Sequence, residues 1–151
     1  MKGEPTMKRT IFTTIIMTII MTTISVPIIN AEMLKNKAVL HHTATTDVPI
    51  EVIRKYHIET KGWIDVGYHY IIRADGTIEE GRDINKVGAH AKGRNNWIGI
   101  ALTGYDEFTD AQYKSLAKLF NELDLQYLEP HHEDCPGSNF DYNKLMEEII
   151  K

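Results

Sequence analysis

The chain has 151 residues, a formal net charge of −4 at pH 7 and one cysteine. Nucleic-acid-binding domains usually cluster positive charge, so the excess of Asp and Glu argues against a nucleic acid partner. A lone thiol excludes an internal disulfide, so Cys135 needs another explanation.

An uncharged segment, residues 10–31, follows directly on two basic residues and ends at the small residue Ala31. This order is typical of a secretory signal peptide that is cleaved after Ala31. We therefore predict a signal peptide at 1–31 and one domain at 32–151, exported to the periplasm or secreted, with no stable membrane association after cleavage. The alternative is an uncleaved anchor, because the segment is nearly long enough to span a bilayer.

Strand and helix signals alternate in the first half of this domain. Lys37–His41 reads as a short buried strand, and Pro49 fits the start of a helix that Gly62 ends. Val66–Arg73 and Thr77–Arg82 flank an Asp-Gly pair, which predicts a β-hairpin.

The second half continues the alternation. Asn96–Thr103 is apolar nearly throughout and should be a central strand covered on both faces. Thr109 and Gln112 predict a capping box for an amphipathic helix, and Leu125–Pro130 reads as a brief strand.

Asp141 can cap a last helix. Four of its residues are expected to face inward: Leu145, Met146, Ile149 and Ile150. The fold class is therefore α/β, a single domain with a mixed central β-sheet flanked by helices.

The stretch Pro130–Gly137 reads PHHEDCPG and combines two histidines with the only cysteine. Imidazole and thiolate in a few residues are ligand chemistry for an ion such as zinc. A catalytic zinc takes three protein ligands, so a third should come from the pair His41-His42. The donor atoms should then lie within about 4 Å of one another. The alternative is that Cys135 is a small buried hydrophobic residue and the histidines lie on the surface.

Several ordered motifs resemble one family across nearly all of the domain. They are LHHTAT (40–45), GWIDVGYHYIIRADGTIEEGRD (62–83), VGAHAKG (87–93), NWIGIALTG (96–104) and HHEDCPG (131–137). Together they resemble the zinc-dependent N-acetylmuramoyl-L-alanine amidases, the group of phage amidase-lysozymes and peptidoglycan recognition proteins.

The resemblance implies a set of site residues. The zinc ligands fall on His41, His131 and Cys135, and the active-site tyrosine falls on Tyr68. His90 and Lys92 fall in a loop that lines the substrate groove: two substrate-binding positions. The implied function is zinc-dependent hydrolysis of the amide bond between N-acetylmuramic acid and L-alanine in peptidoglycan. Separately, we expect the protein to be a monomer.

One motif departs from the family pattern. Only His132, Glu133 and Asp134 separate His131 from Cys135, whereas family members usually have a longer loop, often with a Lys or Thr near its end. Glu133 is the candidate to shuttle protons in place of that residue.

Two other classes of function stand beside the amidase. The shortened loop motivates a peptidoglycan-binding module that is weakly active or inactive, and a cytoplasmic regulator is disfavoured by the leader. His57 and His69 are expected to be packed histidines rather than members of the site.

Overall fold

The computed structural model describes residues 33–151. The predicted signal peptide and the choice between cleavage and anchoring lie outside the described residues. Within 33–151 no helix combines the length and the apolar character needed to cross a membrane.

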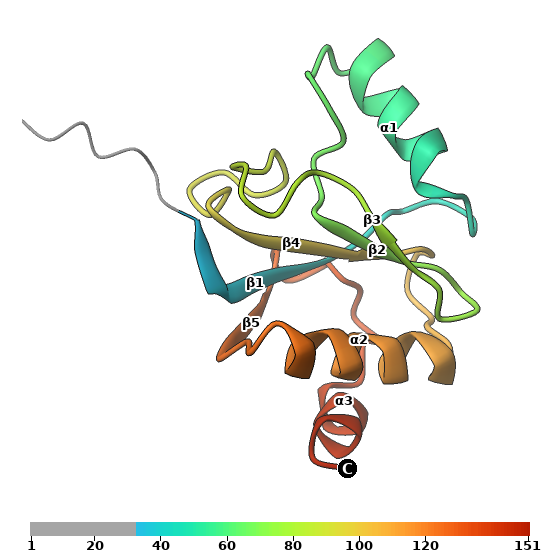
Figure 1. Ribbon diagram of the computed structural model, residues 1–151. Coiled ribbons are helices and arrows are strands. Elements are labelled where there is room, and N and C mark those ends of the chain that lie inside the picture. The colour runs from blue at the N-terminus through green and yellow to red at the C-terminus, as the bar shows by residue number, and fades with distance from the viewer. Residues whose placement is uncertain (1–32) are drawn as a thin grey trace, which may run out of the picture.

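Five strands form one mixed sheet in the order β3-β2-β4-β1-β5 (Figure 1). They are β1 (Leu34–His42), β2 (Tyr70–Ile72), β3 (Ile78–Glu80), β4 (Trp97–Leu102) and β5 (Tyr127–Pro130). The pairs β1–β4, β1–β5 and β2–β4 are parallel, and only β3 runs antiparallel to its neighbour β2. The predicted α/β fold with a mixed central sheet is confirmed.

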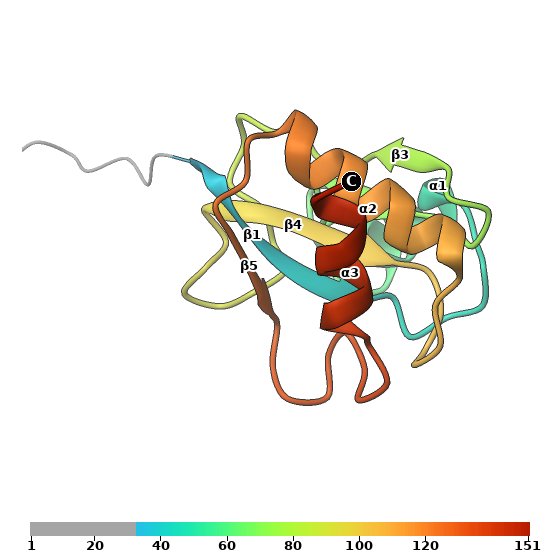
Figure 2. The same cartoon turned by 90° about the horizontal axis from the view of Figure 1, so that it is seen from below.

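Helices cover both faces of this sheet. Helix α1 (Ile50–Glu59) lies on one face, while α2 (Asp110–Glu122) and α3 (Tyr142–Ile149) lie on the other (Figure 1). Seen from the α2 side, the two helices cross in front of β1 and β4 (Figure 2).

Alternation along the strands separates two cores and decides which way the first histidine points. Leu40 and Ile100 belong to the core beneath α2 and α3, whereas Ala101 belongs to the core beneath α1. His41 follows Leu40 and is in register with Ala101, so its side chain faces the α1 side of the sheet.

The predicted helix caps are confirmed. Thr109 and Gln112 form both bonds of a capping box at the start of α2, and the Asp141 side chain accepts two backbone N–H bonds at the start of α3.

The last helix differs from the prediction in its inward face. Leu145 is buried and Ile149 packs against the core, but Met146 is 55% exposed and Ile150 77% exposed. Leu145 and Ile149 are four residues apart, so they lie on the same side of the helix. Met146 and Ile150 each follow one of them and are rotated by about 100° around the helix axis, away from the core. This two-turn surface helix buries only the line of Leu145 and Ile149.

The predicted hairpin exists, but its first strand is shorter than Val66–Arg73. The main chain of Gly67 pairs elsewhere: its N–H donates to His57 Nδ1 at 3.0 Å and its carbonyl accepts from Ala89 N–H. The segment before β2 therefore ties α1 to the loop that contains His90.

Candidate metal centre and active site

Three donors converge at the carboxyl end of β1. His41, His131 and Cys135 each offer one ligand atom, and these atoms lie within 4.8 Å of one another. Because β1 and β5 are parallel neighbours, His41 near the end of β1 and His131 just after β5 reach the same edge of the sheet. The His131 N–H bonds the Leu40 carbonyl at 3.0 Å, which holds His131 beside His41.

The short spacing in HHEDC closes as a tight turn. The main chains of His132 and Cys135 bond each other in both directions, at 3.3 and 3.0 Å. His42 Nδ1 lies 2.6 Å from the Pro136 carbonyl and can donate to it. Cys135 Sγ is thereby placed 3.9 Å from His41 Nδ1. Three intervening residues are therefore enough for both ligands to reach one point, although the spread is wider than the 4 Å expected.

The chemistry of the donors suits zinc. Burial, followed by the nearby charges of His90 and His131, lowers the pKa of His41 to about 2, so its imidazole is neutral and keeps a lone pair. Burial raises the pKa of the Cys135 thiol. A cation at this point would favour the thiolate, and imidazole nitrogen and thiolate sulfur are both zinc ligands.

Tyr68 borders both this cluster and a pocket of about 400 Å³. Its ring centroid lies 5.1 Å from that of His41. Burial, with a smaller effect of Cys135, raises the pKa of Tyr68 to about 12, so the phenol stays protonated and can donate. The pocket is otherwise lined by α1 and by the loops after β1 and β4.

The two groove residues of the prediction lie together on a second depression. His90 and Lys92 line it with Trp63, and its volume is about 390 Å³. Lys92 is exposed. His90 also contacts the metal cluster, since its Nδ1 lies 3.1 Å from His41 Nε2.

Glu133 is exposed at the tip of the tight turn. His57 and His69 are buried and hydrogen-bonded to main chain, as predicted: His57 Nδ1 accepts from Gly67 N–H, and His69 Nδ1 accepts from Gly99 N–H at 2.8 Å.

Sequence reasoning missed an arginine that holds the end of β5. Arg94 Nη2 donates to the His131 carbonyl at 2.6 Å, and Nη1 donates to the Pro130 carbonyl at 3.1 Å. Nothing in the local sequence distinguishes Arg94 from a solvated surface arginine.

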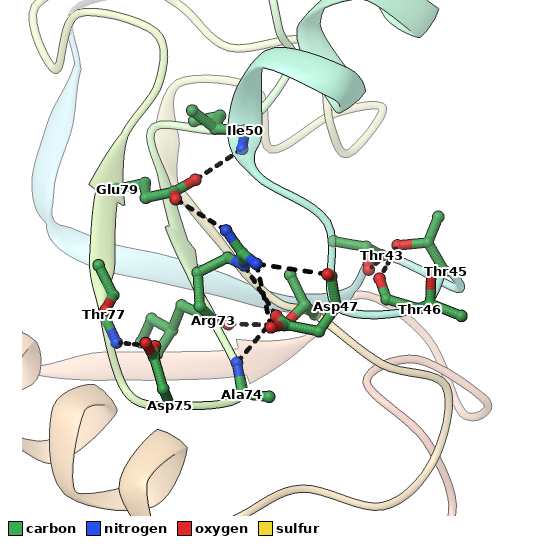
Figure 3. Close-up of polar contacts among 12 residues, drawn as sticks. Thr43, Thr45, Thr46, Asp47, Ile50, Arg73, Ala74, Asp75, Thr77 and Glu79 are labelled. Carbon is green, nitrogen blue, oxygen red and sulfur yellow. Dashed lines mark hydrogen bonds and ion pairs between the residues drawn. The ribbon is translucent and has the colours of Figure 1, made fainter.

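It also missed a polar network that fixes the loop after β1 (Figure 3). Asp47 accepts from Arg73 Nε at 2.8 Å, from the Ala74 N–H and from the Thr103 hydroxyl. Glu79 accepts from Arg73 Nη1 and from the Ile50 N–H at the start of α1. The network anchors the threonine loop, residues 43–46, that forms one wall of the Tyr68 pocket.

The profile of one family, described as N-acetylmuramoyl-L-alanine amidase, matches residues 34–138. The chain belongs to this family.

Among curated proteins, the amidase is similar to an endolysin of Klebsiella phage KP32. The two are 43% identical over 119 residues, and the match covers 69% of this chain and 78% of the endolysin.

Solved structures of similar fold carry related names. One is an N-acetylmuramoyl-L-alanine amidase, LysC from Clostridium intestinale URNW, with 36% identity, a TM-score of 0.67 and coverage of 76% of this chain and 85% of that one. Another is the complex of tracheal cytotoxin with the ectodomains of peptidoglycan recognition proteins LCa and LCx, with 29% identity, a TM-score of 0.64 and coverage of 70% and 77%.

Proposed function

We propose that the amidase hydrolyses the amide bond between N-acetylmuramic acid and L-alanine in peptidoglycan, with zinc held by His41, His131 and Cys135. The observation that carries this proposal is the convergence of three zinc-type donors beside Tyr68 and a pocket. The family and the similarity to the phage endolysin and to LysC support the same activity.

Zinc at such a site would polarise the substrate carbonyl and lower the pKa of a bound water to about 7. Tyr68, as a neutral phenol, would donate a hydrogen bond to the oxygen on which negative charge develops. Glu133 would accept a proton from the attacking water and pass it to the departing amine of L-alanine, in place of the Lys or Thr that the short turn omits.

Substrate would lie across the two depressions, one bordered by Tyr68 and the other by His90, since both residues contact the His41 ring. Lys92 offers an exposed positive charge to the carboxylates of the stem peptide, and His90 forms part of the same wall. The uncharged pocket beside Tyr68 is lined by threonine hydroxyls and tyrosine rings, which suit a peptide with few charges at that point.

The test combines metal analysis with a cell-wall assay. The purified protein should contain about one zinc per chain. Incubation with purified peptidoglycan should release new L-alanine amino termini. Cys135→Ser should lose both metal and cleavage, and chelation should abolish cleavage until zinc is restored. A zinc-free protein with full activity would overturn the scheme.

A second function, peptidoglycan binding with little or no cleavage, is favoured by the absent Lys or Thr and by the similarity to the recognition-protein ectodomains. Such a protein would sediment with the wall and bind zinc, yet release no new amino termini.

We further propose that the domain acts as an exported monomer after cleavage of residues 1–31. Amino-terminal sequencing of the exported protein should then begin at Glu32, and the mature domain should elute as a monomer in size-exclusion chromatography.

A further inference from the structure

A chain of hydrogen bonds connects the metal cluster to a central strand. His41 Nε2 lies 3.1 Å from His90 Nδ1, and His90 Nε2 lies 3.1 Å from the Trp97 carbonyl oxygen in β4. The His41 and His90 rings meet edge to face, with centroids 5.1 Å apart and an interplanar angle of 87°.

The carbonyl fixes the direction of every bond in this chain. A carbonyl oxygen only accepts, so His90 Nε2 must carry a proton and donate to Trp97. In a neutral ring His90 Nδ1 is then the acceptor, and His41 Nε2 must donate to it. His41 is left with its lone pair on Nδ1, the nitrogen that faces Cys135 Sγ.

If the hydrogen bond between His41 and His90 ran in the opposite direction, His41 could not bind a metal ion through Nδ1. If His90 donated through both nitrogens, His41 Nε2 would accept and Nδ1 would carry the proton. That proton would point at Cys135 and leave no imidazole lone pair there for a metal ion.

The fold builds a slot for the His90 ring. A Cβ at Gly99 would lie 2.5 Å from His90 Cδ2, and a Cβ at Gly88 would lie 2.5 Å from the same atom. Asn95 Oδ1 accepts from the N–H groups of both His90 and Ala91, at 2.9 and 2.8 Å, which joins the two ends of the loop that contains His90. Two glycines and a loop clamp thus leave the ring one orientation.

We infer that His90 is a positioning residue, which fixes the tautomer and orientation of His41 so that its Nδ1 lone pair is aimed at the metal. Outer-shell hydrogen bonds of this kind commonly change metal affinity by about 10- to 100-fold. The inference rests on the proposed zinc site. It gives His90 a task distinct from substrate contact, because both of its ring nitrogens already have partners within the protein.

The test measures zinc affinity by competition with a chromophoric chelator. His90→Leu removes the acceptor and should weaken zinc binding by about 10- to 100-fold. His90→Asn places an oxygen where Nδ1 stood and should recover most of the loss, whereas the longer His90→Gln should not. The absorption spectrum of the cobalt(II)-substituted protein should be shared by the wild type and His90→Asn, and should change in His90→Leu.

Gln112→Ala is the matched control, since Gln112 is also buried and hydrogen-bonded to main chain but lies in α2, on the other face of the sheet from His41. It should lower thermal stability and leave zinc affinity unchanged. Zinc affinity in His90→Leu equal to that of the wild type would overturn the inference. The inference would also be overturned if His90→Asn and His90→Leu weakened zinc binding equally and destabilised the metal-free protein equally. That result would mean that His90 has only a structural role.

If His90→Leu does not fold, the Asn and Gln variants decide: tighter zinc binding by Asn supports the inference, and equal binding overturns it. If the wild type binds no zinc, the proposed function fails along with the inference. If the wild type binds zinc and only the His90 prediction fails, the proposed function stands.

Discussion

Gly99 lies in β4 with the His90 ring directly over its α-carbon. The residue matters because any side chain there would occupy the space of that ring. A strand position ordinarily favours a larger residue, so the glycine is explained by close approach and not by strand propensity.

We predict that Gly99→Ala lowers zinc affinity, because its methyl group displaces His90 from His41. Gly99→Ala introduced into a His90→Ala variant should lower zinc affinity little further, because the ring that its methyl group would displace is absent. A double-mutant cycle on stability and on zinc affinity would measure this coupling. Additive effects of the two substitutions would contradict the steric account.

Tyr68→Phe tests the hydroxyl next to the cluster. The substitution keeps the ring that packs near His41 and removes one donor to the developing oxyanion. We expect kcat to fall about 100- to 1000-fold with zinc content unchanged. Tyr56→Phe, on the same pocket but in α1, is the control and should retain more activity than Tyr68→Phe.

At the scale of single residues, the sequence predicted a histidine from each of two pairs together with Cys135, and the family resemblance selected His41 and His131, the two that cluster with Cys135. Their residue types are rare, and one short motif held two of them. The sequence could not predict the hydrogen bond between His41 and His90. The two residues are 49 positions apart, and how β1 and the loop before β4 are placed determines their contact. Arg94 was missed for the same reason.

The turn from His132 to Cys135 is shorter than the resemblance to the family leads one to expect. Its length could be read from the sequence, but its position beside β1 rests on the contact between His42 Nδ1 and the Pro136 carbonyl, 94 positions away, which no local pattern reveals. Helix caps, by contrast, were predictable because Thr109 and Gln112 act within one turn.

Helix α3 offers a matched pair of neighbours for a stability test. Leu145 is 2% exposed and Met146 is 55% exposed. Leu145→Ala should lower the free energy of unfolding by about 2–5 kcal/mol, whereas Met146→Ala should change it by less than about 0.5 kcal/mol. Chemical denaturation of both variants would measure this, and equal losses would contradict the observed orientation of the helix.

The polar network around Asp47 joins the loop after β1, the hairpin and α1 into one unit (Figure 3). Its hydrogen bonds with Arg73 hold the pKa of Asp47 below the ordinary value of 3.8. Because the unfolded chain then binds protons more readily at this carboxyl, the network stabilises the fold above about pH 4 and loses that effect as the pH falls.

We therefore predict that Asp47→Asn destabilises the protein at about pH 6 and that its difference from the wild type shrinks towards about pH 3. Denaturant unfolding at a series of pH values would measure the difference. Glu147→Gln, an exposed carboxylate of α3, is the control and should track the wild type throughout. A constant gap between Asp47→Asn and the wild type would show that the carboxylate charge is not the cause.

The order of the strands in the sheet determines when, during synthesis, the sheet and the donor cluster can be completed. The first strand made, β1, is an interior strand whose neighbours β4 and β5 are translated roughly 60 and 90 residues later. Two of the three donors also follow β5. A nascent polypeptide that stops short of Pro130 has an incomplete sheet and only His41 of the three donors, so the proposed zinc site cannot form until residues 131–135 have emerged.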